Sequence, residues 1–345
     1  MASPTTSTRN LAIDWIKGWM ILCVVLVHTW AFPDIKFYLA VDVFFYISGY
    51  YLMLSFLRKP TTTVQYTWKR IKAIALPFLI CIGFRFLQSP DQFIAWDGLD
   101  SFIDTFAEAF FTITFSEELG IEVSSDGLLI GSWYFSVLII SSFLLYGMLE
   151  YNQKFSSRVL FPMIALVGFN ALIVHSESFS SWTRVGALGF PLLRGFTEMT
   201  TGALICSVYQ ENKAAFEKHP IFLNVMGIIA FILFVLLIFA KQHFDKYLVI
   251  TIPWFLLAAV SDNAWLSKGL EHIRGGIMAW VGQYTLYILC VHWPVIVLVL
   301  WCNEHLWGLA FSGIWLMIIC VLAVVPATFV LVQICKWIRK RLSNR

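Results

Sequence analysis

Charged residues are scarce in this chain of 345 residues. Only 13% are Asp, Glu, Lys or Arg, about half the share that soluble globular proteins carry. No polar stretch is long enough to form a separate soluble domain, and hydrophobic residues, 59% of the total, fall in long runs between clusters of charge. No single soluble core could absorb so many apolar segments, so lipid must surround their outer faces. The composition therefore excludes a soluble globular protein and indicates a multi-pass membrane protein.

Sequence patterns for metal, redox and nucleic-acid chemistry are also missing. The seven cysteines form no CxxC pair and no metal-ligand spacing, which predicts that they pack as small apolar side chains. We therefore expect no metal site and no tightly bound cofactor. The basic residues form no polar face of the kind that binds nucleic acid, so no nucleic-acid partner is expected. The segment MASPTTSTRN lacks the features of a signal peptide, and we expect the first apolar segment to remain as a helix.

Several apolar segments are long enough for membrane-spanning helices, which need roughly 20 residues each. The ten candidates lie at about 11–31, 37–57, 73–89, 132–149, 159–175, 188–208, 221–240, 247–264, 277–301 and 309–335. A further segment, 100–115, is amphipathic and acidic, which predicts an interfacial or re-entrant helix instead of a span. The sequence thus predicts an all-α integral membrane fold. It would be a bundle of about ten transmembrane helices forming a single domain over residues 1–345.

The distribution of basic residues predicts the direction of these spans. Lys and Arg favour cytoplasmic segments. With the N-terminus inside, 17 of the 24 basic residues fall in inner segments and four in outer segments. The loop 90–131 has neither Lys nor Arg and carries nine acidic residues, as an outer loop can. We therefore expect both termini to be cytoplasmic.

The first span, 11–31, carries ionisable residues near both ends. Ionisable side chains at membrane depth are costly, so each is a candidate functional residue. Lys17 and His28 are eleven residues apart, which places them on one helix face, about 16 Å apart along the axis. Asp14 lies three residues before Lys17 and can pair with it. His28 is either a catalytic imidazole or one that is merely hydrogen-bonded near the interface, and the sequence leaves both interpretations open.

The second span, 37–57, places Asp42 one to two turns from its outer end. The loop that joins it to the first span is short, which predicts adjacent antiparallel helices with His28 and Asp42 at similar depth. A carboxylate that orients an imidazole is a familiar general-base arrangement. The alternative is that Asp42 only caps its helix or reaches the interface.

Two later spans also contain buried ionisable groups. Arg194 and Glu198 are four residues apart and can neutralise each other, as a structural pair or in a polar cavity. His292 lies well inside the ninth span, and Pro294 follows it and loosens the local helix. A water-filled cavity would account for this imidazole.

Several short patterns follow one another along the chain. They are Asp14 followed by a basic residue, ten spacers and a histidine (Lys17 to His28), VDVFFYISGYY (41–51), WKRIKAIALP (68–77), GSWYF (131–135) and GQYTLYILCVHWPV (282–295). In this order they resemble the acyltransferase family 3 membrane proteins, which include bacterial O-acetyltransferases of surface polysaccharides. Lys17 stands where that family usually has arginine, which keeps the charge but loses the fork of the guanidinium. Thr285 stands where serine is common.

The resemblance implies a membrane enzyme that passes an acyl group, acetyl above all, from acyl-CoA to a hydroxyl of a cell-surface or lipid-linked carbohydrate. Acetyl-CoA or another acyl-CoA would be the co-substrate, and the bacterial plasma membrane the location. The implied site residues are His28 as base or acyl carrier with Asp42 orienting it, Lys17, Arg70 and Lys72 on the coenzyme A phosphates, and Asp14, Arg194, Glu198 and His292 lining the cavity.

Two other classes of function fit the composition. Buried His, Asp, Arg and Glu residues in ten helices also suit a proton-coupled transporter or a polysaccharide exporter. Such a carrier would tolerate the loss of the basic cluster that an acyltransferase needs for coenzyme A. A purely structural membrane partner would tolerate replacement of His28 by Gln and of Asp42 by Asn. The sequence indicates no oligomeric state.

Overall fold

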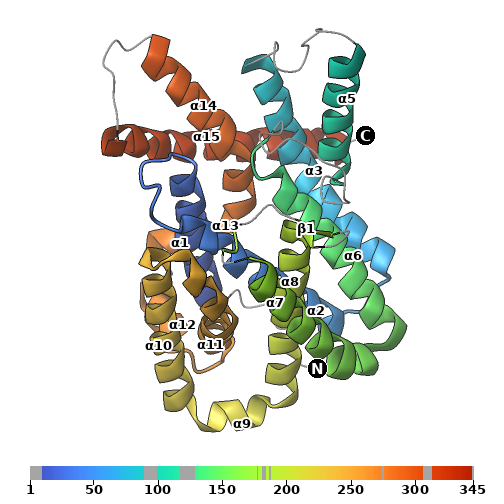
Figure 1. Cartoon of the computed structure of the whole chain (residues 1–345). Coiled ribbons are helices and arrows are strands. Elements are labelled where there is room, and N and C mark those ends of the chain that lie inside the picture. The colour runs from blue at the N-terminus through green and yellow to red at the C-terminus, as the bar shows by residue number, and fades with distance from the viewer. Residues whose placement is uncertain are drawn as a thin grey trace.

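The computed structural model describes residues 10–88, 99–116, 129–176, 178–180, 184–185, 188–273, 276–305 and 313–343. Within these ranges the chain is almost entirely helical (Figure 1). The longer helices are α1 (Leu11–Val27), α2 (Ala40–Arg58), α3 (Thr63–Gln88), α5 (Leu99–Thr114), α6 (Ser132–Phe155), α7 (Phe161–His175), α8 (Phe190–Glu211), α10 (Pro220–Phe239), α11 (Leu248–Val260), α14 (Thr285–His305) and α15 (Gly313–Ser343). The shorter ones are η1 (Phe37–Leu39), η2 (Ser156–Leu160), α9 (Lys213–Lys218), η3 (Gln242–Tyr247), α12 (Trp265–His272) and α13 (Gly276–Gln283). The all-α prediction is confirmed for these residues, apart from one antiparallel pair of two-residue strands, β1 (Arg184–Val185) and β2 (Leu188–Gly189).

Several of these helices can cross a membrane. In the described part of the chain, seven helical segments are long and apolar enough to do so. They are Phe37–Arg58, Thr63–Gln88, Ser132–His175, Pro220–Phe239, Gln242–Val260, Thr285–His305 and Gly313–Ser343. The segment Ser132–His175 has 44 residues and contains two of the expected spans, since η2 joins α6 to α7. The fold is that of a multi-pass membrane protein, whereas the number of ten spans and the cytoplasmic termini stay predictions.

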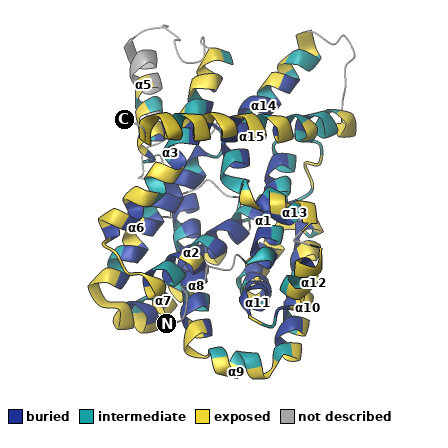
Figure 2. Cartoon of the chain, turned by 180° about the vertical axis from the view of Figure 1, so that it is seen from behind, coloured by how far each residue is buried: buried dark blue, intermediate teal, exposed yellow. Residues whose placement is uncertain are grey.

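The outward faces of the peripheral helices are apolar. Leu166 and Val174 on α7, Ile221 on α10 and Leu322 on α15 are each more than half exposed, and Figure 2 shows the exposed colour along the outer sides of these helices. Large apolar side chains in water would each cost about 1.5–3 kcal/mol relative to burial. This pattern fits helices that have lipid as their solvent.

One expected span differs in the structure. The segment 277–301 is divided at Tyr284 into α13 and α14 instead of forming one continuous helix. At the division, Oγ1 of Thr285 donates to the carbonyl of Gly282 at 2.7 Å, which satisfies a carbonyl at the end of α13. The segment 100–115 is helical as expected, as α5, although its position relative to a bilayer is untested.

Helix α2 lies at the centre and packs most extensively against α8. Glycines allow this close approach: a Cβ atom at Gly49 would strike the backbone of Met199, and one at Gly202 would strike the backbone of Tyr46. Small residues at a crossing let two membrane helices approach closely. The crossing fixes the relative position of the polar residues that both helices carry.

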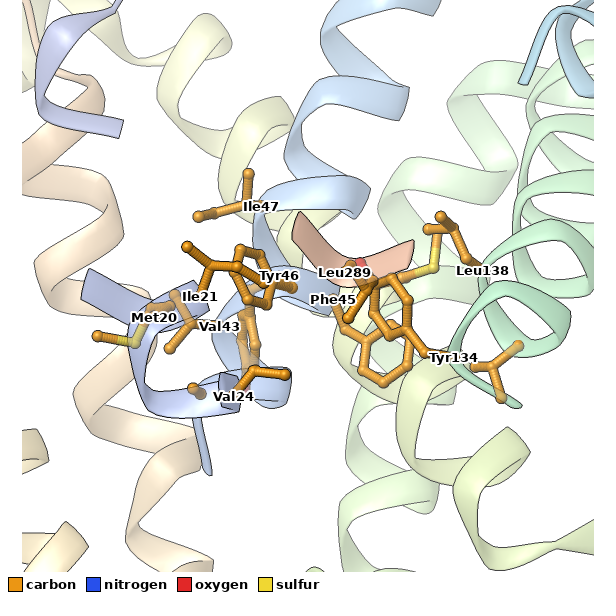
Figure 3. Packing of buried hydrophobic residues seen from close by; sticks show 14 of the residues in the cluster. Met20, Ile21, Val24, Val43, Phe45, Tyr46, Ile47, Tyr134, Leu138 and Leu289 are labelled. Atoms are coloured by element: carbon orange, nitrogen blue, oxygen red, sulfur yellow. The ribbon is translucent and has the colours of Figure 1, made fainter. Parts of the chain in front are cut away.

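Helix α1 packs beside α2 through an apolar layer (Figure 3). Met20 and Ile21 of α1 lie against Val43, Tyr46 and Ile47 of α2, and all five are buried. Near the top of Figure 1, helix α15 crosses α14 and α3. The apolar layer separates two groups of polar residues, one near each end of α1.

Candidate active site

A cavity of about 160 Å³ opens at the C-terminal end of α1. Its walls include Val24, His28, Tyr38, Trp133, Tyr134 and Arg194. These residues come from α1, η1, α6 and α8, segments that are far apart in the sequence. We call it the His28 cavity. It is mostly apolar and aromatic with a few polar groups, which is the usual make-up of a site for an organic ligand.

A second cavity, of about 800 Å³, lies near the N-terminal half of α1. Its walls are largely polar and include Asp14, Lys17, Tyr50, Arg58, Tyr209 and Lys213. We call it the Lys17 cavity. Met20 and Ile21 of α1 and Tyr46 and Ile47 of α2, which lie between the two sets of walls along their helices, belong to the apolar layer of Figure 3. The two cavities share no wall residue.

His28 forms the C-cap of α1, and its ring contacts a second imidazole. Nε2 of His292, on α14, lies 3.2 Å from Nδ1 of His28, and the ring centroids are 4.9 Å apart. His292 is fully buried. The structure thus brings together two sequence-predicted residues that are 264 positions apart.

The hydrogen bonds around the two rings assign their tautomers. Nδ1 of His292 lies 2.9 Å from the carbonyl of Leu289, and Nδ1 of His28 lies 2.8 Å from that of Val24. A carbonyl oxygen only accepts, so each neutral ring carries its hydrogen on Nδ1. Nε2 of His292 then accepts from Nδ1 of His28, and Nε2 of His28 keeps its lone pair. Among the described residues, that nitrogen has no hydrogen-bond partner, and His28 lines the cavity.

Two tryptophans pack in sequence beside His28. The ring of Trp293 lies 6.2 Å from that of His28 and 5.8 Å from that of Trp30. Trp30 has a left-handed φ of 50°, which is uncommon for a residue other than glycine and is often found at functional sites. The chain therefore turns sharply just after His28 and holds an aromatic cover beside it.

Asp42 has a different partner from the one expected. Its two carboxylate oxygens accept from Arg194, with Nε to Oδ1 at 2.7 Å and Nη2 to Oδ2 at 2.6 Å. Asp42 is fully buried and Arg194 is 4% exposed. The sequence interpretation has Asp42 orienting His28, but the structure gives it this bidentate ion pair, and His292 takes the place beside the imidazole. The bidentate geometry fixes the plane of the guanidinium.

Arg194 still has N–H groups to offer. A guanidinium carries five N–H donors. Two of them bond to Asp42, and a third, on Nη1, donates to the carbonyl of Phe179 at 2.6 Å. The other two have no protein partner among the described residues, and Arg194 lines the His28 cavity. Glu198 is also fully buried, with Oε1 3.7 Å from Nε of Arg194, so the expected pairing of Arg194 and Glu198 is present as the longer contact.

The basic residues expected to act together lie apart. Lys17 lines the Lys17 cavity, and its Nζ donates to Oδ1 of Asp14 at 3.2 Å. Arg70 lies within the bundle, where Nη1 donates to Ser142 at 2.7 Å. Lys72 is exposed and lies over the ring of Trp68. Neither Arg70 nor Lys72 is among the residues that line the Lys17 cavity.

Sequence reasoning missed several residues of these cavities. Arg58 and Lys213 bring two further cations into the Lys17 cavity. Both read as ordinary cytoplasmic loop charges in the sequence. Tyr38 and Tyr134 line the His28 cavity. Tyr38 is marked in the sequence only by its position at the start of a predicted span, whereas Tyr134 lies within the GSWYF pattern. Over the described residues, no group of three or more His, Cys, Asp or Glu is arranged to hold a metal ion.

Comparison with known families gives one match. The model of acyltransferase family 3, described as an acyltransferase domain, matches residues 10–333. This range includes every candidate residue named above. No curated protein and no solved structure matches the chain.

Proposed function

Because the chain belongs to acyltransferase family 3, it is a membrane acyltransferase, and we propose that it moves an acyl group from acyl-CoA to a hydroxyl of a carbohydrate. The acyl group is acetyl in the first place, and the acceptor is a cell-surface or lipid-linked glycan. The observation that carries the proposal is the imidazole of His28, which lines a cavity while its Nδ1 lies within hydrogen-bond distance of Val24 and His292, an arrangement that leaves Nε2 to act as the base. A nitrogen base in this state is what acyl transfer to a hydroxyl needs.

His28 acts as the general base in this mechanism. Its Nε2 takes the proton of the acceptor hydroxyl as the oxygen attacks the thioester carbonyl carbon. The tetrahedral intermediate then collapses, the C–S bond breaks, and the proton passes from Nε2 to the leaving thiolate. The hydrogen on Nδ1 stays directed at Val24 and at Nε2 of His292, which keeps the ring in the required tautomer.

The walls of the His28 cavity suit a sugar. Trp133 and Tyr134 offer aromatic surface against which the apolar face of a sugar ring can pack. The two remaining N–H groups of Arg194 can donate to acceptor hydroxyls or to the oxyanion of the tetrahedral intermediate. Stabilisation of such a developing charge by fixed donors is a large part of catalysis in acyl transfer.

The donor binds in the Lys17 cavity in this proposal. Lys17, Arg58 and Lys213 line this cavity, and Lys17 and Lys213 can exchange their present partners, Asp14 and Asp262, for the phosphates of coenzyme A. The rise of a helix separates Lys17 from His28 by about 16 Å, a distance comparable to the pantetheine arm. Arg70 and Lys72 do not face this cavity, so we assign the phosphates to the other three cations.

The arrangement requires a passage between the cavities. With both termini cytoplasmic and ten spans, the Lys17 cavity opens inward and the His28 cavity lies towards the outer surface of a bacterial plasma membrane. The apolar layer around Ile21 and Tyr46 must part to let the thioester reach His28 (Figure 3).

One observation also favours a carrier. Two cavities on opposite sides of a packed layer, with the buried ion pair of Arg194 and Asp42 beside one of them, suit alternating access. A proton-coupled transporter or polysaccharide exporter is therefore the second candidate. It predicts movement of a glycan or lipid-linked sugar without any acyl transfer.

The experiment incubates membranes that contain the protein with radiolabelled acetyl-CoA and a glycan extract from the host. Wild type is compared with His28→Ala and with His175→Ala, which removes an exposed imidazole on α7. We expect label in glycan with wild type and His175→Ala only. Equal transfer by His28→Ala would overturn the mechanism. If no variant transfers label and the purified protein does not bind coenzyme A, the carrier is favoured. Label retained on the protein when the glycan is omitted would instead make His28 an acyl carrier.

A further inference from the structure

Asp245, on η3, is a fully buried carboxylate outside the proposed mechanism. Its Oδ1 forms an ion pair with Nζ of Lys36, which is 4% exposed and also donates to the carbonyl of Lys241 at 3.2 Å. Its Oδ2 accepts from the hydroxyl of Tyr38 at 2.7 Å and from the backbone N–H of Phe179 at 3.1 Å. Three segments of the chain, around positions 36–38, 179 and 241–245, thus meet at a single carboxylate.

Two of these partners lead directly to the His28 cavity. Tyr38 lines the cavity itself. Both backbone polar groups of Phe179 form hydrogen bonds. Its N–H donates to Asp245, and its carbonyl accepts from Nη1 of Arg194 at 2.6 Å. Asp245 therefore fixes Nη1 of Arg194 through the backbone of Phe179, while Asp42 fixes Nε and Nη2 directly.

The network also sets which way the cavity groups donate and accept. Because a carboxylate only accepts, the hydroxyl of Tyr38 directs its hydrogen to Asp245. The phenol oxygen is left to accept, from Oγ of Ser178 at 3.1 Å or from a ligand hydroxyl. Arg194 supplies N–H donors on the same cavity. A hydroxyl group both donates and accepts, so it can bond to this pair of residues at once.

The charges around Arg194 limit the ligand further. Asp42 accepts from Nε and Nη2 of the Arg194 guanidinium, and the carboxyl of Glu198 lies 3.7 Å from Nε. One guanidinium thus faces two acidic side chains, all of them buried. The cavity accordingly offers hydrogen-bond donors without an excess of positive charge.

We propose that Asp245 is a positioning residue for the acceptor: through Phe179 and Tyr38 it fixes a donor and an acceptor group that select an uncharged hydroxyl-bearing substrate. This inference rests on the proposed function for the identity of the acceptor. The geometric part, in which Asp245 holds the wall of the His28 cavity, does not depend on acyl transfer.

The experiment combines kinetics with a readout that needs no activity. Asp245→Asn weakens the acceptor of Tyr38 and Phe179 but leaves Lys36 without its counter-ion. The double variant Lys36→Gln with Asp245→Asn removes both charges and so separates that cost from positioning. Glu211→Gln is the control, because Glu211 forms an exposed ion pair with Arg158 on another part of the surface. Each variant is purified, its thermal stability is measured, and the KM for glycan and for acetyl-CoA are determined.

We expect the double variant to regain the stability of the wild type and to keep a KM for glycan raised about tenfold, as expected when the acceptor loses one hydrogen bond to the cavity wall. The KM for acetyl-CoA should not change. Equal changes in both KM values, or full recovery of the glycan KM in the double variant, would show a structural role only and overturn the proposal. The matched control should change neither constant.

The second readout is the rate at which a membrane-impermeant maleimide labels Ser180→Cys, a position on the cavity wall next to Phe179. We expect the labelling rate of Ser180→Cys to rise severalfold when Lys36→Gln and Asp245→Asn are added, compared with Ser180→Cys alone. An unchanged rate contradicts the geometric claim even if transfer is lost. If the wild type itself transfers no acyl group, the proposed function fails, and the labelling rate still decides whether Asp245 holds the wall.

Discussion

Nε2 of His292 lies 3.2 Å from Nδ1 of His28, so that α14 supplies the group that orients the candidate base on α1. His292 is itself fixed through Nδ1 by the carbonyl of Leu289 at 2.9 Å. With this tautomer the second ring accepts the hydrogen of the first, and Nε2 of His28, a residue that lines the cavity, is left to act as the base. In the proposed mechanism the two imidazoles act as one unit, with His28 reacting and His292 orienting it.

The first prediction concerns this pair. His292→Ala should lower kcat for acyl transfer by about 100-fold, because His28 loses the acceptor that fixes its tautomer and orientation. His292→Gln should recover part of the rate, since its amide oxygen can accept from Nδ1. His28→Ala and the double alanine variant should be equally inactive, since residues that act as a unit are not additive. Losses that simply multiply in the double variant would mean that the two rings act separately.

The second prediction concerns the stability of the buried charges. Arg194→Met leaves the carboxyls of Asp42 and Glu198 buried without their cation, whereas Asp42→Asn leaves Arg194 with Glu198 at 3.7 Å. Removing one partner of a buried pair costs about 3–5 kcal/mol. Arg194→Met should therefore lower the free energy of unfolding by at least that amount, and Asp42→Asn by less.

Denaturant titration of purified protein measures both variants. Glu211→Gln is the control, and it should change the free energy of unfolding by less than about 1 kcal/mol because its ion pair with Arg158 is exposed. A larger loss for Asp42→Asn than for Arg194→Met would contradict the assignment of Arg194 as the shared cation.

The sequence predicted the helical elements well and their contacts less well. Hydropathy correctly predicted the helix α1, which contains Lys17 and is capped by His28, and the membrane cost of ionisable groups singled out Arg194 and His292, both of which are buried. Spacing within one helix says which residues share a face, but it does not say which distant helix will cover that face. His28 meets His292 across 264 positions, a contact set by how α14 docks on α1.

The misplaced basic cluster has a similar cause. Charge counting assigns Arg70 to an inner loop with Lys72, since both lie near the start of a predicted span. The structure begins α3 at Thr63, ten residues before the expected span, so that Arg70 lies inside a helix and donates to Ser142 of α6. Hydropathy marks the apolar part of a helix and not its polar first turns, so the start of such a helix is easily missed.

The third prediction separates the two sets of basic residues. Arg58→Gln and Lys213→Gln should each raise the KM for acetyl-CoA about tenfold, because a hydrogen bond to a charged group contributes about 1.5–3 kcal/mol. Lys59→Gln is the matched control, since Lys59 is exposed and lies next to Arg58. Steady-state kinetics at varied acetyl-CoA measure the effect. A tenfold rise for Lys72→Gln with no change for Arg58→Gln would instead favour a phosphate site at the start of α3.

The fourth prediction uses two glycines in consecutive helices of the chain, α2 and α3. Gly49→Ala should lower the free energy of unfolding by about 1–3 kcal/mol, because its Cβ would strike the backbone of Met199 where α2 crosses α8. Gly83→Ala on α3 should raise it by about 0.5–1 kcal/mol, because open space surrounds that position and alanine favours a helix over glycine. Thermal unfolding of the two purified variants in the same detergent measures both changes. Both variants add one methyl group to a helix, so the opposite signs test the packing at Gly49 and not helix propensity. A gain in stability for Gly49→Ala would mean that α2 and α8 do not cross at Gly49. The crossing would then no longer explain why Asp42 and Arg194 lie together.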